Sequence, residues 1–208
     1  MRTTRSPVYV ILNHPALRRA WEVGEAAVEG GAGLLQFRTK ERLRDLDLAA
    51  LRVLVRRAAA AGVPLLINDH VDLACEIGAA GIHVGQSDAG VLAARGALGE
   101  AAIVGVTTPT VELAVQAEGE GASYVAVGAM YASPTKPEKP VLGPERLRAV
   151  AGAVSVPVCA IGGITAERIP ELLAAGARLL AVISAVSAAP DSYRAVCELV
   201  AACDPPLR

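Results

Sequence analysis

Short apolar runs recur along the whole chain and are the clearest pattern in the sequence. Most are built from aliphatic residues, and glycine, proline or charged residues separate each run from the next element. Continuous apolar runs of this length are typical of strands that are buried on both faces of a parallel sheet. Eight strands are therefore predicted, over residues 8–12, 34–37, 64–67, 82–84, 102–106, 124–127, 156–161 and 179–182.

Segments with helical periodicity lie between these runs. In residues 46–61, Leu51, Leu54 and Val55 fall on one helical face, and residues 166–175 show the same spacing. Strict alternation of strand and helix through eight units favours a closed parallel barrel. At 208 residues the chain has the length of one such barrel. We therefore expect an α/β fold, a single (β/α)8 TIM barrel forming one catalytic domain over residues 1–208.

Four Gly-Ala pairs support this alternation. Each pair stands two residues before a predicted strand, where a helix should end: Gly31-Ala32, Gly78-Ala79, Gly121-Ala122 and Gly176-Ala177. A glycine just past a helix readily takes the left-handed conformation that ends it. The pairs therefore predict four helix-to-strand junctions.

An open, doubly wound sheet is the alternative architecture. That fold is expected to carry a G-x-G-x-x-G turn after its first strand, whereas Asn13, His14 and Pro15 follow the first run here. The barrel also predicts the position of the active site, because the loops at the carboxyl ends of the strands form it. Polar residues at those ends are the candidates for function.

Composition and charge narrow the function classes. The chain is 53% hydrophobic with 20 basic and 21 acidic residues, so a net charge of −1 gives no general attraction to nucleic acid or to an anionic membrane. The apolar run at 8–12 is too short for a signal sequence, and no run reaches the length of a membrane span. The four cysteines form no C-x-x-C pair, so we expect buried free thiols and a cytoplasmic, reducing location.

Alternating polar residues follow the second strand. Gln36, Arg38 and Lys40 can project to one side where strand becomes loop, and two cations beside an amide suit an anionic substrate. The alternative is that these residues form the solvated start of a charged helix over 41–47.

Two carboxylates end neighbouring strands. Asp69 follows Asn68 after the third strand, and Asp88 follows the fourth, so their oxygens suit Mg2+. Asp88 is also well placed to cap the helix that ends near Leu98. His83 at the end of the fourth strand is either a packed, hydrogen-bonded residue or a participant in the chemistry.

Hydroxyl and basic residues follow the fifth and sixth strands. Thr107 is a candidate ligand contact, and Thr108 is expected to cap a helix beginning at Pro109. The longest connection in the chain, residues 128–143, contains Ser133-Pro134-Thr135-Lys136. Long loops in compact domains are usually functional or mobile, and these hydroxyls with the ammonium of Lys136 suit phosphate oxygens.

Backbone amide groups are the candidate ligands after the last two strands. Gly162 and Gly163 follow the seventh strand, and Ile183 and Ser184 follow the eighth. In barrels, backbone amides after these two strands often hold a phosphate. The alternative is that the two glycines serve only as a tight turn.

Taken in chain order, six motifs resemble those of the thiamine-phosphate synthase family, and the resemblance covers nearly the whole chain. They are Gln36-x-Arg38-x-Lys40, Asn68-Asp69, His83-x-Gly85-Gln86-x-Asp88, Ser133-Pro134-Thr135-Lys136, Ala160-Ile161-Gly162-Gly163-Ile164 and Val182-Ile183-Ser184. The family joins a hydroxymethylpyrimidine diphosphate to a thiazole phosphate, or its carboxylated form, giving thiamine monophosphate and pyrophosphate.

The resemblance implies a role for each motif. Contacts to the pyrimidine diphosphate would come from Gln36, Phe37, Arg38, Thr39, Lys40, Asn68, Thr107 and Lys136, and His83 would also contact substrate. Contacts to the thiazole phosphate would come from Ser133, Pro134, Thr135, Gly163, Ile183 and Ser184. The metal ligands for Mg2+ would be Asp69 and Asp88.

The family's chemistry is dissociative, with pyrophosphate leaving before the thiazole nitrogen captures a pyrimidine-methyl cation. Arg38, Lys40 and Lys136, with Mg2+, would then stabilise charge growing on the leaving group, so we expect these three residues and Thr107 to be catalytic.

Three positions depart from the family pattern. Thr107 stands where serine is usual and Ser133 where threonine is common, so both keep a hydroxyl. Thr39 replaces a usual glutamate, and losing that carboxylate beside two cations either strengthens phosphate attraction or loosens a supporting ion pair.

Two other functions compete with the synthase. A thiazole tautomerase of the same barrel family needs neither a diphosphate clamp nor a metal, so the cations and aspartates favour the synthase. A phosphate-binding protein without catalysis is the second. Small-molecule substrates are the expected partners, and a homo-oligomer is compatible with the sequence.

Overall fold

Eight parallel strands close into a barrel in the computed structural model, which describes residues 6–13, 17–40, 43–85, 90–133 and 140–204. Each strand pairs with the next in chain order, and β8 pairs with β1 through Val8 and Leu180. The strands are β1 (Val8–Asn13), β2 (Leu34–Arg38), β3 (Leu65–Asn68), β4 (Gly81–Val84), β5 (Ile103–Thr107), β6 (Tyr124–Gly128), β7 (Val158–Ile161) and β8 (Leu179–Val182). The predicted (β/α)8 TIM barrel is confirmed.

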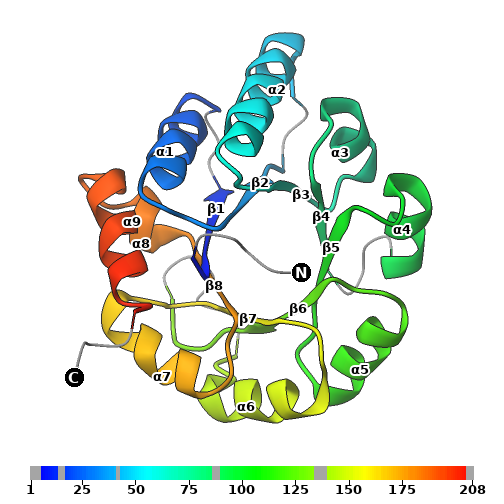
Figure 1. Ribbon diagram of the computed structural model, residues 1–208, viewed down its shortest axis with the longest axis vertical. Coiled ribbons are helices and arrows are strands. Elements are labelled where there is room, and N and C mark those ends of the chain that lie inside the picture. The colour runs from blue at the N-terminus through cyan, green and yellow to red at the C-terminus, as the bar shows by residue number, and fades with distance from the viewer. Residues whose placement is uncertain (1–5, 14–16, 41–42, 86–89, 134–139, 205–208) are drawn as a thin grey trace.

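Helices form an outer ring around the strands (Figure 1). They are α1 (Leu17–Glu29), α2 (Asp45–Ala60), α3 (Val71–Ile77), α4 (Val91–Leu98), α5 (Val111–Gly119), α6 (Gly143–Ala153), α7 (Ile169–Ala174), α8 (Ser184–Ser187) and α9 (Ser192–Ala201), with a 3-10 helix η1 (Ala166–Arg168) before α7. The helix predicted over 166–175 is thus split into η1 and α7. Pro170 lies in the first turn of α7, where its missing N–H costs least.

Alternate strand residues face two separate apolar cores. One set packs inside the barrel and includes Tyr9, Leu34, Leu66, Tyr124 and Leu179. The other set faces the helices, and there Leu51, Leu54 and Val55 of α2 are buried as their spacing predicts. Because strand side chains alternate, the inward set also fixes which residues reach the barrel mouth at the strand ends.

The four Gly-Ala junctions are confirmed. All four glycines have positive φ, between 66° and 99°, and Gly78 is the left-handed residue that ends α3. In this conformation a side chain would be strained, so glycine is the residue that turns each helix back toward the sheet.

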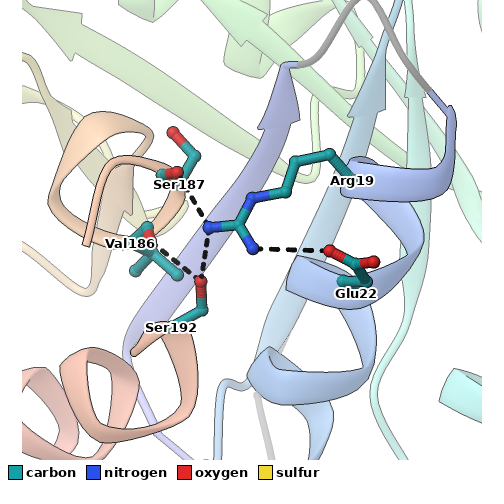
Figure 2. Close-up of polar contacts among 5 residues, drawn as sticks. All are labelled: Arg19, Glu22, Val186, Ser187 and Ser192. Carbon is teal, nitrogen blue, oxygen red and sulfur yellow. Dashed lines mark hydrogen bonds and ion pairs between the residues drawn. The ribbon is translucent and has the colours of Figure 1, made fainter. Parts of the chain in front are cut away.

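A basic side chain joins the first helix to the last two. Arg19 of α1 donates hydrogen bonds to the Ser187 carbonyl at 3.1 Å and to Ser192 Oγ at 3.3 Å, and it pairs with Glu22 at 3.5 Å (Figure 2). Ser192 Oγ donates in turn to the Val186 carbonyl at 3.1 Å. The end of α8 and the start of α9 are therefore tied to α1, beside the seam where β8 meets β1.

The cysteines are free thiols, but the prediction of burial is wrong for most of them. Only Cys159 is buried, whereas Cys197 and Cys203 are half-buried and Cys75 is exposed. On α3 the residues that face the core are Ala74 and Ile77, which leaves Cys75 between them on the outer side. Within the described parts of the chain, no helix is both long and apolar enough to cross a bilayer.

Candidate active site

The last inward residue of several strands carries a polar side chain at the barrel mouth. Following the inward set along each strand leads to Asn13 on β1, Arg38 on β2, Asn68 on β3 and Thr107 on β5, while His83 lies on β4. The pairing register sets Asn13 beside Arg38 and Asn68 beside His83. Residues distant in sequence thus meet on one rim, where barrel enzymes bind their substrates.

A chain of hydrogen bonds runs across the barrel interior beneath this rim. Gln36 Nε2 donates to the Tyr9 hydroxyl at 2.5 Å, and the hydroxyls of Tyr9 and Tyr124 lie 2.9 Å apart. From Tyr124 the chain continues to His83 Nδ1 at 2.8 Å, and His83 Nε2 lies 3.0 Å from Thr107 Oγ1. Four of the barrel's inward positions therefore support the Thr107 hydroxyl from below.

Ring packing holds these side chains in place. The rings of Tyr9 and Tyr124 meet edge to face at 6.0 Å, while Tyr124 stacks on His83 at 5.6 Å. Burial raises the pKa of both tyrosines well above the usual value. Both phenols therefore stay neutral, and each has one hydrogen to donate.

Arg38 is held at the rim by a neighbouring amide. Its Nη1 donates to Asn13 Oδ1 at 2.7 Å. Lys40 is exposed and Thr39 is half-buried beside it. Phe37 points the other way, with its ring 2% exposed in the core between strands and helices, so only its backbone faces the mouth. The strand thus gathers Gln36 and Arg38 at the site and turns the Phe37 side chain away.

Asp69 lies just past β3 in a left-handed conformation with φ of 63°. The Asn68 amide donates to its carboxylate, and its backbone N–H donates to the His83 carbonyl at 2.9 Å. Asp88 lies outside the described residues. No group of three or more His, Cys, Asp or Glu side chains suited to a metal occurs within the described ranges. Of the two predicted metal ligands, Asp69 and Asp88, the structure therefore describes only Asp69.

The connection after β6 packs against the turn after β7. The Tyr131 hydroxyl donates to Glu171 at 2.6 Å, and the Arg168 guanidinium lies 4.2 Å above the Tyr131 ring and donates to the Gly163 carbonyl. Gly163 has φ of 65°, and a Cβ there would lie 2.8 Å from Tyr131 Cβ. The glycine is therefore required by the tight turn, and the cluster fixes where its backbone lies. Ser133 is described, whereas Pro134, Thr135 and Lys136 lie outside the described residues.

Ile183 and Ser184 lie at the mouth after β8. Ser184 begins the short helix α8, and Ile183 precedes it with φ of −122° and ψ of −82°. Both residues are half-buried. They close the rim on the side where Arg19 ties α8 down.

A sequence model of the thiamine monophosphate synthase family matches residues 8–186. The chain belongs to this family. A thiamine-phosphate synthase of Roseiflexus castenholzii is 42% identical over 203 residues, covering 95% of this chain and 89% of the relative. One of Haloquadratum walsbyi is 40% identical over 190 residues, covering 90% and 85%.

A solved family structure has the same fold. The thiamine phosphate pyrophosphorylase from Pyrococcus furiosus superposes with a TM-score of 0.84 at 32% identity, covering 94% of each chain. The resemblance that the six motifs carry is therefore confirmed at the level of the family.

Two helix caps in this family member differ from the prediction. The N-cap of α5 is Thr110, whose hydroxyl accepts from the Leu113 N–H at 3.3 Å, so the prediction that Thr108 caps is wrong. Thr108 directly follows β5, and its N–H donates to the Ala126 carbonyl of β6 at 2.8 Å, so the helix begins later. The N-cap of α4 is Gly90, so this helix does not begin at the position that the alternative, capping role of Asp88 requires.

Sequence reasoning missed Asn13, Tyr9 and Tyr124. The two tyrosines stand inside apolar runs, and that pattern alone indicates only strand residues. Their phenol groups were the available signal, because a buried tyrosine usually finds a hydrogen-bond partner.

Proposed function

We propose that the chain is a thiamine-phosphate synthase, which joins a hydroxymethylpyrimidine diphosphate to a thiazole phosphate or its carboxylated form. The observation that carries the proposal is the grouping of Arg38, Asn68, Asp69 and Thr107 on one rim of a barrel of this family. An acyl or glycosyl transfer would call for a nucleophile or a carboxylate pair. Cations beside an aspartate suit a phosphorylated leaving group.

In the proposed reaction the bond between the methylene carbon and the diphosphate oxygen breaks, and the electron pair leaves with pyrophosphate. The thiazole nitrogen then donates its lone pair to the pyrimidine-methyl cation, forming the new C–N bond. Arg38 and Lys40 hold the leaving group and oppose its growing charge. No side-chain nucleophile takes part, so positioning and electrostatics supply the catalysis.

The donor set fits Mg2+. Asp69 presents a hard carboxylate oxygen at a strand end, and Asn68 adds an amide that orients it. We propose Asp69 and Asp88 as the ligands that would hold the ion. Bound there, Mg2+ would neutralise diphosphate charge.

The remaining proposed contacts come from the segments that follow β6, β7 and β8 in the sequence. Ser133, Pro134 and Thr135, with Gly163, Ile183 and Ser184, would hold the thiazole phosphate, and Lys136 would face the pyrophosphate. The support is the packing of Tyr131 and Arg168, which keeps the Gly163 backbone fixed beside the start of this loop. We propose that residues 1–208 act as one catalytic domain in the cytoplasm.

One assay tests the function. The purified protein is incubated with both substrates and Mg2+, and thiamine phosphate is measured by chromatography. Product that depends on both substrates and disappears with chelator is expected. A folded protein that makes no thiamine phosphate at any Mg2+ concentration would refute the proposal, and turnover of a thiazole phosphate tautomer alone would identify a tautomerase.

Lys136→Ala sharpens the test of the loop. We expect it to reduce turnover at least tenfold, about 1.4 kcal/mol of transition-state stabilisation, because it removes a cation from the leaving group. Lys139→Ala, a charge change in the same segment of the sequence, is the matched control and should leave turnover near normal. Equal activity in both variants would contradict the role of Lys136.

A further inference from the structure

Five polar side chains that cross the barrel interior are linked one to the next by hydrogen bonds. The series passes from Gln36 on β2 to Tyr9 on β1 and Tyr124 on β6, then to His83 on β4 and Thr107 on β5. Gln36, Tyr9 and Tyr124 are each 2% exposed or less. The Tyr9–Tyr124 contact and both His83 contacts leave donor and acceptor open, so the series has a defined direction only if its first donor is fixed.

The amide group of Gln36 fixes that direction. Its Nε2 carries hydrogens and can only donate, so the Tyr9 oxygen accepts. The buried Tyr9 hydroxyl still needs an acceptor for its own hydrogen, and Tyr124 is its other partner among the described hydrogen bonds. That hydrogen therefore goes to Tyr124, and the single hydrogen of Tyr124 goes to His83 Nδ1. Nδ1 must therefore lack a hydrogen, and Nε2 carries the ring's hydrogen and donates to Thr107 Oγ1.

We propose that Tyr9 and Tyr124 are positioning residues that hold His83 as the neutral Nε2–H tautomer and thereby make the Thr107 hydroxyl a hydrogen-bond donor at the barrel mouth. Because His83 donates to its oxygen, Thr107 directs its own hydrogen to another acceptor. The identity of that acceptor as an oxygen or ring nitrogen of the pyrimidine diphosphate rests on the proposed function. The tautomer of His83 does not depend on the proposed function.

The backbone of β5 makes room for this arrangement. A Cβ on Gly105 would lie 2.0 Å from Tyr124 Cζ and 2.4 Å from its hydroxyl oxygen. Gly105 stands between the inward residues Ile103 and Thr107, so the missing side chain leaves the space that the phenol fills. The same strand therefore places both the pocket for Tyr124 and the hydroxyl that the series supports.

Nitrogen-15 NMR of histidine-labelled protein tests the tautomer directly. The chain has three histidines, and loss of one signal in His83→Gln assigns the ring. We expect a protonated Nε2 and an unprotonated Nδ1 in the wild type. Tyr124→Phe should give a mixture of tautomers, because it removes the donor to Nδ1. An Nδ1–H tautomer or an imidazolium in the wild type would overturn the proposal. An unchanged His83 tautomer in Tyr124→Phe would also overturn it.

A double-mutant cycle tests whether Tyr124 acts through Thr107. We expect Tyr124→Phe and Thr107→Val each to lower kcat/KM for the pyrimidine diphosphate about tenfold, the effect of one hydrogen bond. The double variant should fall no more than about twofold below either single one. Multiplying losses, about 100-fold in total, would show that Tyr124 is merely structural.

Controls separate this proposal from folding and from the proposed function. Tyr193 is 49% exposed on α9, and Tyr193→Phe should keep normal kinetics. If Tyr124→Phe does not fold, Tyr9→Phe breaks the same series one link earlier and should also mix the tautomers. If the wild type makes no thiamine phosphate, the proposed function fails while the NMR result still decides the tautomer.

Discussion

Replacing Gly105 with alanine tests how tightly the barrel interior is filled. The added carbon would lie 2.0 Å from Tyr124 Cζ and 2.2 Å from Cε1, whereas carbon atoms normally approach to about 3.5 Å. The difference requires the ring to move by about 1.5 Å. Gly105 does not have a positive φ, so the backbone itself accepts alanine and the cost is steric.

The expected loss of stability follows from these contacts. Overfilling a packed core costs about 1–3 kcal/mol, and shifting the ring loosens the hydrogen bonds of Tyr124 to Tyr9 and His83, worth about 1 kcal/mol each. Alanine returns about 0.4–1 kcal/mol by restricting the unfolded chain. Gly105→Ala should therefore lower the free energy of unfolding by about 2–4 kcal/mol.

Urea denaturation followed by far-UV circular dichroism measures this loss. Gly96→Ala is the matched control, because a Cβ there meets no atom within 4 Å on α4, and it should stabilise the protein by about 0.5–1 kcal/mol. A Gly105→Ala midpoint equal to that of wild type would refute the packing argument. A wild-type midpoint together with a mixture of His83 tautomers would show that the Tyr124 ring moves without any cost in stability.

Three further predictions concern other parts of the molecule. Arg19→Met should cost about 1–2 kcal/mol in urea denaturation by freeing the carbonyl of Ser187, whereas Glu22→Gln should cost less than about 1 kcal/mol; equal losses would contradict this. Burial and Glu171 raise the pKa of Tyr131 from 10.0 to about 12. The unfolded state then loses this proton first, so stability should be full below pH 10 and decline as pH rises through about 12, less steeply in Tyr131→Phe; identical pH profiles would rule this out. Asp69→Asn should keep its folding stability within about 0.5 kcal/mol, since asparagine tolerates the left-handed conformation, but lose its Mg2+-dependent turnover; retained metal response would exclude Asp69 as a ligand.

The barrel was predictable because its signals are local. Each strand is built on a short, mostly apolar run, and each of the four Gly-Ala junctions has the positive φ that the pattern requires. The rim was predictable from the barrel itself, which places Arg38 and Thr107 at strand ends on the same face of the barrel. These features depend on residues close together in sequence or on a rule of the fold.

The interior series was not predictable because it depends on contacts between distant residues. Tyr9 and Tyr124 are 115 positions apart, and only the closed barrel brings their hydroxyls to 2.9 Å. The prediction of the α5 cap is wrong for a similar reason, because the hydrogen bond from Thr108 N–H to the distant Ala126 carbonyl holds Thr108 beside β6 and the helix begins later. The prediction that Cys75 is buried is wrong because only one face of the short helix α3 packs against the core. Ala74 and Ile77 lie on that face, and Cys75 lies on the exposed one.

The seam between β1 and β8 also affects how the protein is made. β1 leaves the ribosome long before its second neighbour, which begins at Leu179, and the Arg19 partners Ser187 and Ser192 emerge later still. Until then the nascent chain carries an unpaired apolar strand edge, which invites pairing with other chains. We expect stalled or truncated translation products that lack β8 to aggregate or to require a chaperone, whereas release of the full chain lets the ring close.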